Sequence, residues 1–287
     1  MPKENSQKIY FIVGPTASGK TALSIELAKK LGSCEVISCD SRQIFRDFDL
    51  ATGKVTKEEM DGVPHHMLDI VDPGQEFSVV DFTNMALEKI EDIFSRDKTP
   101  IVCGGTGFYV DNLIYDYKLP SVAKNDILRK ELEPKTTKEL YLILKDLDRK
   151  YAKEMINKQE QNNKVRLIRA IEIATTLGCV PKLKKIDRFS NVEFIFTNIP
   201  REELRAKIHA RILARLEQGM LEEIKSVQQK YNLSYDYLEK LGLEFKWAAK
   251  YFRKQITEEQ FVENLFIETC QYARRQDTWF RRYKNYK

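Results

Sequence analysis

Residues 14–21 read GPTASGKT, which matches the phosphate-binding loop pattern G-x-x-x-x-G-K-[S/T]. The apolar run KIYFIV at 8–13 precedes it and reads as a buried strand, and an apolar-periodic helix is expected over 22–31, closed by Gly32. This context matters because the N–H groups of the loop and the positive end of the helix then face the same anion. The motif, typical of ATP-binding and other nucleotide-binding proteins, predicts a di- or triphosphate ligand without specifying ATP.

Every position of this loop has an expected part in holding phosphate. Backbone N–H groups between the two glycines would surround the anion, and the Lys20 ammonium would reach its terminal group. The Thr21 hydroxyl suits Mg²⁺, a hard cation that prefers oxygen ligands and phosphate partners. The predicted di- or triphosphate site is the whole run: Gly14, Pro15, Thr16, Ala17, Ser18, Gly19, Lys20 and Thr21.

Strands and helices alternate downstream of the loop. The runs EVISC at 35–39 and PIVC at 100–103 read as buried strands, and 80–94 has the apolar spacing of a helix. This alternation predicts a parallel sheet with crossover helices. Because chemistry in such sheets sits at the carboxyl ends of the strands, Asp40 and Thr106 are expected on the same edge as the phosphate loop.

The character of the chain changes after Pro120. Residues 121–190 are rich in Lys, Glu and Leu, with helical periodicity over 137–147 and 164–177 and no recognisable strand. A strand, VEFIFTNI, then returns at 192–199, and helices are expected at 201–230, interrupted at Gly219, and at 255–282.

The expected fold class is therefore α/β: a P-loop NTPase-like parallel sheet with an inserted helical module and a helical C-terminal region. Residues 1–118 and 191–287 would form a P-loop kinase-like core. Residues 119–190 would form the module, which is inserted between two strands of the sheet.

Composition limits the class of protein. The 287 residues are 42% hydrophobic and 32% charged, which excludes collagen-like, low-complexity and disordered chains. No apolar run approaches the roughly 20 residues of a membrane helix, and the polar start MPKENSQKIY predicts no secretory signal. The five cysteines are scattered without C-x-x-C spacing, so neither a disulfide framework nor a zinc site is expected. The predicted location is cytoplasmic.

Charge is divided unevenly along the chain. Residues 1–118 carry 13 Lys and Arg against 19 Asp and Glu, residues 119–190 carry 17 against 10, and residues 191–287 carry 18 against 14. Solvated helix faces explain single lysines, but this separation favours a polyanionic partner contacting the module and the tail. Charge alone does not distinguish RNA, DNA and a membrane surface.

Asp40 and Thr106 each allow two interpretations. Asp40 ends the second strand, where it could hold Mg²⁺ through water or act as a general base. Thr106, within Gly104-Gly105-Thr106-Gly107, could be a turn residue or donate a hydrogen bond to a departing oxygen.

Two other pairs of residues are expected to be structural. His65 and His66 lack a third ligand at metal-binding spacing. Trp247 and Trp279 are expected to pack in the core or on the surface rather than to stack on bases.

Six segments together resemble the tRNA dimethylallyltransferases, also called tRNA isopentenyltransferases, of the bacterial type. The resemblance covers nearly the whole chain. The segments are GPTASGKT (14–21), DSRQ (40–43), GGTGFY (104–109), VRLIRAIE (165–172), PREELRAKIHARI (200–212) and QYARRQDTWFR (271–281). The zinc finger of eukaryotic members is missing, and KLGLEFKW at 240–247 stands where many members have a Gly-Tyr-basic run.

This resemblance implies transfer of a dimethylallyl group from dimethylallyl diphosphate to N6 of adenosine 37, giving N6-dimethylallyladenosine and diphosphate. It implies tRNAs that read codons beginning with U, bound through the anticodon stem-loop. Separately from the resemblance, we expect a monomer, although the sequence carries no signal for the oligomeric state. It also implies a P-loop kinase-like fold, a Mg²⁺ requirement, and a P-loop that holds the prenyl diphosphate in place of ATP.

The resemblance also assigns roles to residues. The catalytic set is Asp40, which accepts or positions the N6 proton, with Thr106, Lys20 and Arg211, the last helping to hold the diphosphate. Ser41, Arg42 and Gln43 would read the extruded adenine. The residues implied to contact tRNA are Asp40, Ser41, Arg42, Gln43, Thr106, Arg129, Val165, Arg166, Leu167, Ile168, Arg169, Arg275 and Gln276.

The chemistry of that reaction suits these residue types. An adenine amino group is a poor nucleophile and needs a base, and a departing diphosphate needs cations. Two rival classes share the same motif. A small-molecule or nucleoside kinase would transfer the γ-phosphate of ATP, and a non-catalytic RNA-binding NTPase would bind tRNA yet tolerate loss of Asp40.

Overall fold

The computed structural model describes residues 7–117, 120–157, 160–183 and 185–286. The chain divides into two compact units, residues 1–115 with 187–287 and residues 116–186. The predicted domain boundary after residue 118 lies outside the described residues. Residues 1–6, which form most of the polar N-terminal stretch that predicted no secretory signal, also lie outside them. The other predicted boundary, after residue 190, falls shortly beyond the structural one at residue 186.

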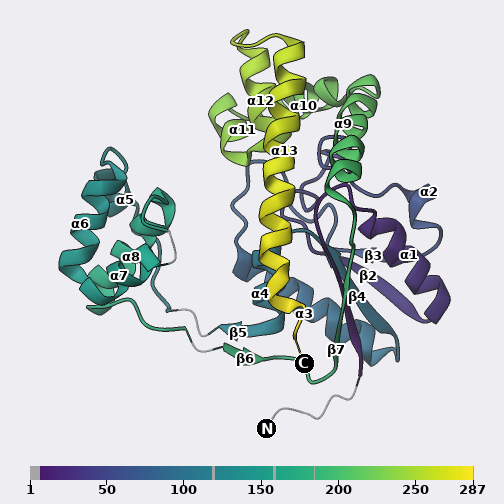
Figure 1. Cartoon of the computed structure of the whole chain (residues 1–287), viewed down its shortest axis with the longest axis horizontal. Coiled ribbons are helices and arrows are strands. Elements are labelled where there is room, and N and C mark those ends of the chain that lie inside the picture. The colour runs from purple at the N-terminus through teal and green to yellow at the C-terminus, as the bar shows by residue number, and fades with distance from the viewer. Residues whose placement is uncertain (1–6, 118–119, 158–159, 184, 287) are drawn as a thin grey trace. The chain divides into compact units, whose positions relative to one another are not determined.

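The first unit is built on a five-stranded sheet in the order β3-β2-β4-β1-β7, in which every neighbouring pair is parallel (Figure 1). The predicted parallel sheet with crossover helices is confirmed. The strands are β1 (Ile9–Val13), β2 (Cys34–Ser38), β3 (His65–His66), β4 (Thr99–Gly104) and β7 (Val192–Phe196).

Alternate side chains of the strands face two different hydrophobic clusters, as the two-residue period of a strand requires. Ile9, Phe11 and Val13 of β1 belong to the large cluster beneath the C-terminal helices. Tyr10 and Ile12 point the other way, into a smaller cluster that includes residues of the first helix. Burial on both faces explains why the central strands read as continuous apolar runs.

Helices surround this sheet. Gly219, at φ 96°, separates two of them at the predicted break. The helices of the first unit are α1 (Lys20–Leu31), α2 (Lys57–Met60), α3 (Val79–Ser95), α4 (Gly107–Ile114), α9 (Arg201–Glu217), α10 (Met220–Lys230), α11 (Tyr235–Leu241), α12 (Leu243–Phe252) and α13 (Glu258–Phe280), followed by a 3₁₀ turn at Arg281–Tyr283.

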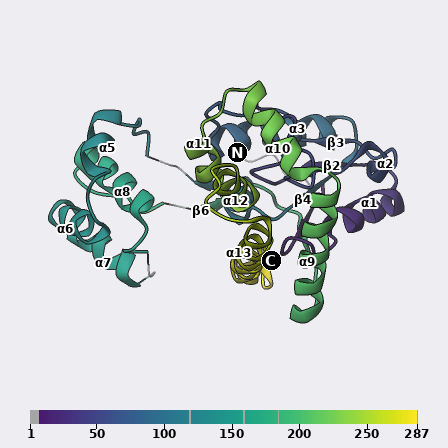
Figure 2. The ribbon, with the colours of Figure 1, turned by 90° about the horizontal axis from the view of Figure 1, so that it is seen from above.

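The long helix α13 connects several parts of this unit. It packs against α9, α12 and α4. Figure 2 shows α13 close to end-on, with α12 beside it. Its first turn is closed by a capping box in which Thr257 and Gln260 bond each other's backbone N–H groups. Because α13 packs against these helices, its residues near the C-terminus lie at the carboxyl ends of the first strands.

The second unit is helical, with its own core of leucine, isoleucine and alanine side chains. Its helices are α5 (Asp126–Leu132), α6 (Thr137–Leu147), α7 (Arg149–Asn157) and α8 (Lys164–Leu177). The expectation of no strand in 121–190 is wrong, because β6 (Lys185–Asp187) pairs with β5 (Tyr115–Tyr117) in a two-stranded sheet. β6 could not be predicted from the sequence because its three residues are all exposed and show no apolar pattern.

Within the described ranges, no helix combines the length and apolar character needed to cross a bilayer.

Glu35 of β2 forms a buried ion cluster at the far end of the sheet from the phosphate loop. Its carboxylate, 3% exposed, accepts hydrogen bonds from Arg96 (2.5 and 2.8 Å), Lys98 (2.7 Å) and His66 (2.7 Å). Hydrogen bonds from Arg96, followed by those from Lys98 and His66, hold the pKa of Glu35 well below its usual range despite burial. The charge is therefore compensated, and removing it would leave three cationic or polar partners without an acceptor.

Replacing Glu35 by Gln should lower the free energy of unfolding at pH 7 by ~3 kcal/mol, the usual cost of breaking a buried ion pair. Because the folded-state pKa is depressed, this stabilisation is present above the unfolded pKa of about 4.3 and is lost as pH falls below it. Urea denaturation of both proteins at pH 7 and at lower pH measures the difference. A difference that does not shrink in acid would contradict the assignment.

Candidate active site

The phosphate loop connects β1 to α1 and is stabilised by side chains of its own and of β7's C-terminal extension. Ser18 Oγ donates to Pro15 O (2.8 Å) and lies 2.6 Å from Thr197 Oγ1. Lys20 Nζ donates to Pro15 O at 2.6 Å. Arg211, from α9, donates from Nη2 to Thr16 Oγ1 at 2.6 Å. The cation at the start of α1 and a cation from α9 therefore border the same loop.

Both cations are held in a poorly hydrated environment. Burial lowers the pKa of the Lys20 ammonium to about 8, and the positive charge of Arg211 acts in the same direction. Burial, with repulsion from Arg215, lowers the pKa of Arg211 to about 10. Desolvated neighbouring cations are stabilised by an anion placed between them, so the loop favours a phosphate-bearing ligand.

Asp40 begins a tight turn directly after β2. Its Oδ1 accepts from the backbone N–H groups of Arg42 (2.8 Å) and Gln43 (3.4 Å). One carboxylate oxygen thus fixes the turn, and the group stays at the sheet edge where it was predicted. Gln43 is itself engaged by protein on both sides of its amide, by Ser38 Oγ (2.9 Å) and Gly53 O (3.1 Å).

Thr106 lies next to the Asp40 turn. Its Oγ1 accepts from the backbone N–H of Ser41 at 3.1 Å, and the Tyr272 hydroxyl of α13 hydrogen-bonds to it. Burial, together with the nearby negative charge of Asp40, raises the pKa of Tyr272 well above its usual value. Tyr272 therefore stays a neutral phenol that can donate a hydrogen bond at the same point as Thr106.

Gln276 links three of the motifs. Its Oε1 accepts from Thr16 N at 2.8 Å, and its Nε2 donates to Gly105 O at 2.9 Å. The approach is close enough to require glycine: a Cβ on Gly105 would lie 2.1 Å from Gln276 Nε2, and one on Gly107 would lie 2.3 Å from Trp279 Cδ1. Gly105 and Gly107 therefore leave room for α13, whereas Gly104 leaves room for the backbone of Cys39.

Two cavities meet at this edge of the sheet. The loop-side cavity, of about 320 Å³, is lined by the phosphate loop, Gly104, Gly105 and Lys207, among others. The α13-side cavity, of about 260 Å³, is lined by residues of the Asp40 turn, α9, α12 and α13. Four residues line both: Thr16, Asp40, Thr52 and Arg211.

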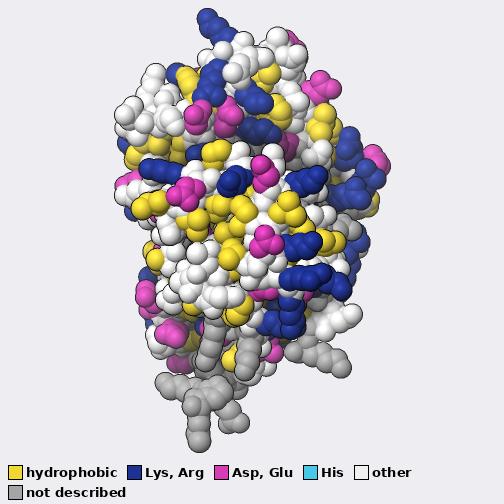
Figure 3. Space-filling view, turned by 90° about the vertical axis from the view of Figure 1, so that its left-hand side faces the viewer, with side chains coloured by type: hydrophobic (Ala, Val, Ile, Leu, Met, Phe, Trp, Pro, Cys, Tyr) yellow, Lys and Arg dark blue, Asp and Glu magenta, His cyan; other side chains and the backbone are white. Residues whose placement is uncertain are grey.

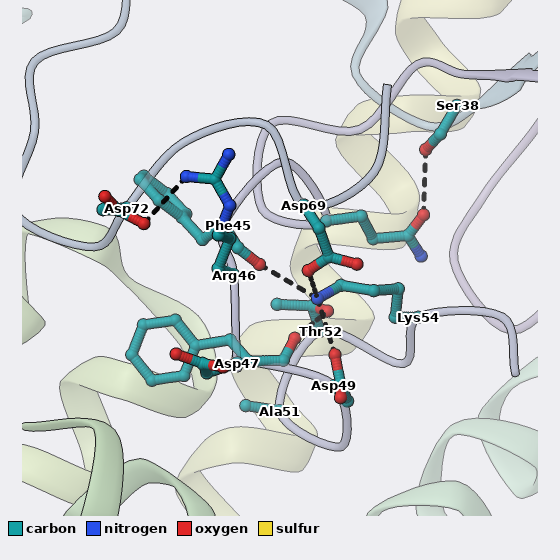
Figure 4. A network of polar contacts seen from close by, with 12 residues as sticks. Ser38, Phe45, Arg46, Asp47, Asp49, Ala51, Thr52, Lys54, Asp69 and Asp72 are labelled. Carbon is teal, nitrogen blue, oxygen red and sulfur yellow. Dashed lines mark hydrogen bonds and ion pairs between the residues drawn. The ribbon is translucent and has the colours of Figure 1, made fainter. Parts of the chain in front are cut away.

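The segment after the Asp40 turn forms a wall of these cavities and is held by a polar network (Figure 4). The almost buried Lys54 ammonium contacts Phe45 O (2.9 Å), Asp49 Oδ1 (2.6 Å) and Asp69 Oδ1 (2.5 Å). Across from it, Glu223 of α10 accepts from three consecutive backbone N–H groups, those of residues 49–51, at 2.8–3.0 Å. Thr52 is thereby fixed between two tethered stretches of backbone.

Comparison with known proteins decides the family. A family model described as IPP transferase matches residues 43–283, and one described as isopentenyl transferase matches residues 7–74. The tRNA dimethylallyltransferase 2 of Treponema denticola is 43% identical over 276 residues, covering 94% of this chain and 90% of that protein. This chain belongs to the IPP transferase family.

Solved structures agree with this membership. The full-length tRNA isopentenylpyrophosphate transferase of Bacillus halodurans is 35% identical, with a TM-score of 0.71 over 97% of this chain and 88% of that one. A eukaryotic dimethylallyltransferase acting on tRNA gives a TM-score of 0.80 at 29% identity, over 96% of this chain and 70% of that one. The predicted family and the predicted α/β fold class are confirmed.

In this IPP transferase, the residues implied to contact tRNA fall into different environments. Val165 is 77% exposed, and Arg166 is exposed and pairs with Glu160. Leu167 and Ile168, by contrast, are 0% and 6% exposed and belong to the core of the helical unit. Their position on the inner face of α8 does not support contact of their side chains with tRNA.

Arg129 and Arg169 share one partner. Arg129 forms two hydrogen bonds with Glu172 (2.6 and 2.7 Å), and Arg169 contacts the same carboxylate at 3.1 Å. Glu172 is buried, and its pKa is lowered to about 2 by hydrogen bonds from Arg129, Asn125 and Arg169, which outweigh the opposing effect of burial. Arg129 therefore holds α5 to α8, Arg169 contacts Glu172 within α8 and donates to Val122 O, and part of each arginine stays exposed.

Gln276 and Arg275, the two C-terminal residues implied to contact tRNA, differ in exposure. Gln276 is 4% exposed with its amide used inside the protein, so the tRNA contact implied for it is not supported by its position. Arg275 is exposed and lines the α13-side cavity with Arg42, whose guanidinium donates to the carbonyls of Ser41 and Leu241.

The histidines and tryptophans are placed as structural residues. His66 bonds Glu35, and no group of three potential metal-binding side chains occurs in the described part of the chain. Trp247 Nε1 donates to Glu268 (2.7 Å) and Trp279 Nε1 to Asp111 (3.1 Å).

Basic side chains are spread among exposed apolar and acidic ones on one face of the molecule (Figure 3). The helical unit contributes many of the large exposed apolar side chains: Ile127, Leu142, Leu147, Ile156, Val165, Leu177, Leu183 and Ile186. This mixture suits a surface that contacts a polyanion through both charges and apolar groups.

Several site residues were missed by the sequence reasoning: Lys207, Arg215, Glu244, Glu268, Thr269 and Tyr272. The spacing of Lys207 and Arg215 in the sequence could have identified these two residues. Residues 207, 211 and 215 are spaced by four in a predicted helix, which places three cations on the same face as Arg211.

Gln276→Glu should weaken the binding of inorganic pyrophosphate about tenfold or more, because a carboxylate cannot donate to Gly105 O and adds a negative charge beside the loop. Isothermal titration calorimetry measures this. The exposed Gln271→Glu on the same helix is the matched control and should bind pyrophosphate normally. If Gln276→Glu instead weakened only the binding of stem-loop RNA, the result would support the tRNA contact that the family resemblance implies for Gln276.

Proposed function

We propose that this chain transfers the dimethylallyl group of dimethylallyl diphosphate to N6 of adenosine 37 in tRNAs that read codons beginning with U. The products are N6-dimethylallyladenosine and diphosphate. The proposal is supported by the family, whose curated members are named tRNA dimethylallyltransferases, and by the site geometry. A cytoplasmic monomer that binds the anticodon stem-loop is part of the same proposal.

The observation that carries the proposal is the meeting of two cavities at Asp40. The loop-side cavity offers cations and N–H groups for a diphosphate, and the α13-side cavity offers mixed polar groups for a nucleoside. An adenine entering from one side and a prenyl diphosphate from the other would place nucleophile and leaving group on opposite sides of C1. A base must leave its stack to enter such a pocket, and loop nucleotides do so most easily.

In the transfer step, the N6 lone pair forms a bond to C1 of the dimethylallyl group while the C1–O bond breaks. The electron pair of that bond leaves with the diphosphate. Asp40 accepts or positions the departing N6 proton, and Thr106, held by Ser41 N–H and Tyr272, lies beside the reacting centre. Lys20, Arg211 and the loop N–H groups stabilise the growing charge on the diphosphate.

A divalent cation such as Mg²⁺ fits the residues at the loop. The Thr21 side chain lines the loop-side cavity and is exposed, and its hydroxyl has no hydrogen-bond partner among the described residues. Thr21, with Asp40 through water, would hold the ion against diphosphate oxygens, the ligands that Mg²⁺ prefers. When bound, the ion supplies charge neutralisation to the leaving group.

The helical unit would bind phosphates of the stem-loop through its excess of basic residues. Residues 119–190 carry 17 Lys and Arg against 10 Asp and Glu. Exposed Arg166 and Val165 at the start of α8, the outer parts of Arg129 and Arg169, and Arg275 of α13 supply the contacts in this proposal.

The decisive experiment is mass spectrometry of nucleosides from tRNA treated with the protein and dimethylallyl diphosphate. A dimethylallyl group on adenosine supports the proposal. Label entering a small molecule from γ-labelled ATP would favour the kinase instead. Bound tRNA without any modified nucleoside would favour a non-catalytic RNA-binding protein.

Asp40→Asn should retain tRNA affinity and lose about 10²–10⁴-fold in turnover, because Asn keeps the turn but cannot accept the proton. Single-turnover prenylation of tRNA measures the rate, and filter binding measures the affinity. The exposed Asp97→Asn is the control variant. An unchanged rate for Asp40→Asn would exclude the assigned role.

Donor binding should weaken as pH rises through about 8, because the Lys20 ammonium deprotonates in the free enzyme above that pKa. The protonated form binds the diphosphate, so affinity is greatest below the pKa. Lys20→Arg should remove this inflection, since a guanidinium stays charged throughout. Calorimetric titration of dimethylallyl diphosphate between pH 7 and pH 9 tests both proteins, and an identical profile for the two would contradict the assignment.

A further inference from the structure

We infer that Arg215, Glu244 and Thr269 form a wall that recognises the ribose 2′-hydroxyl of the nucleotide whose base reaches Asp40. This inference rests on the proposed function and names a specificity determinant for it. All three side chains line the α13-side cavity together with Asp40.

Arg215 and Glu244 are nearly buried yet keep most of their hydrogen-bonding capacity. Their side chains are 11% and 13% exposed, and Arg215 Nη1 lies 3.7 Å from Glu244 Oε1, which is an ion-pair distance but too long for a hydrogen bond. Within the described part of the chain, neither side chain makes a hydrogen bond. A charged pair taken out of water without hydrogen bonds is costly, so a polar ligand that bonds both groups would relieve the cost.

Thr269 is an independent third observation. It is 2% exposed, and its Oγ1 has no hydrogen-bond partner within the described part of the chain. It lies in α13, one turn before Tyr272, and lines the same cavity. Buried polar groups in proteins are nearly always paired, so an unpaired hydroxyl at a cavity wall points to a ligand atom.

The backbone holds the wall in place. Gly242 adopts φ 80° and ψ −176°, a region open essentially to glycine alone, and this places Glu244 in the first turn of α12. Arg215 lies one turn beyond Arg211 on α9, against the backbone of Gly53, where a Cβ would fall 1.5 Å from its Nη2. The donor and the acceptor are therefore presented by rigid elements.

The chemistry of the wall selects a hydroxyl. A carboxylate beside the cation disfavours a second phosphate, and charged groups disfavour the methyl groups of a prenyl chain. A ribose 2′-hydroxyl both donates and accepts: it can donate to Glu244 and accept from Arg215 or Thr269. Acidic side chains bind ribose hydroxyls in this manner in dinucleotide-binding proteins. Glu244 supplies the acceptor of this wall.

The test uses two synthetic anticodon stem-loop RNAs that differ only by 2′-deoxyadenosine at the target position. Wild-type protein should prenylate the ribose form with a kcat/KM roughly 10- to 100-fold higher, the effect of one hydrogen bond to a charged group. Glu244→Ala and Arg215→Ala should each lower this ratio toward one, because alanine can neither accept from the hydroxyl nor donate to it. Glu263→Ala is the matched control and should keep the wild-type ratio, because Glu263 is exposed on α13 and lines neither cavity.

Each outcome decides the question. A wild-type ratio near one, with both RNAs prenylated, would overturn the inference and leave the proposed function intact. A large ratio unchanged in Glu244→Ala and Arg215→Ala would also overturn it, because the hydroxyl would then be read elsewhere. Product from neither RNA would overturn the proposed function and this inference with it. The affinity of each variant for dimethylallyl diphosphate is measured as well. A variant that binds it normally is folded, so a lower kcat/KM ratio in that variant reflects the lost hydroxyl contact.

Discussion

The site depends on one amide. Gln276 accepts from Thr16 N–H and donates to Gly105 O, and so joins the phosphate loop, the turn after β4 and the C-terminal helix. Three motifs far apart in the chain become one unit through these two hydrogen bonds. The close approach explains why Gly105 has no side chain, and why the helix that supplies Tyr272 and Thr269 stands over the carboxyl ends of the strands. The same helix forms one wall of the α13-side cavity.

The second constraint is electrostatic. Lys20 and Arg211 are half-buried beside the loop, and desolvation lowers the pKa of each. The Glu35 cluster is the opposite case, since a buried carboxylate there is matched by Arg96, Lys98 and His66. The fully buried charge is Glu35, and its ion partners are residues of the protein itself. The comparison separates a structural ion cluster from a ligand site by chemistry alone.

Local patterns predicted the fold well, because each depends on neighbouring residues. The buried run before Gly14 and the helix after Lys20 were readable from periodicity, whereas β3, with two residues, carries no period. Site residues were predictable where a motif fixes the backbone, as at Asp40. Gln276 follows Arg274 and Arg275, and the family resemblance assigned it to tRNA. No local signal shows that its amide faces a loop 260 positions away. The burial of Leu167 and Ile168 was readable: they share the inner face of α8 while Val165 does not.

The distribution of charge between the two cavities determines which ligand each cavity favours. Lys20, Lys207 and Arg211 line the loop-side cavity, and Asp40 is the one acid among its described lining residues. The α13-side cavity mixes arginines with Asp40, Glu244 and Glu268, so it presents donors and acceptors in similar measure. A diphosphate is therefore favoured on the first side and an uncharged, hydrogen-bonding nucleoside on the second. Because Asp40 borders both, the proton leaving the nucleoside and the charge developing on the diphosphate are separated from the outset. The same arrangement opposes the reverse placement, in which a diphosphate would face Glu244 and Glu268.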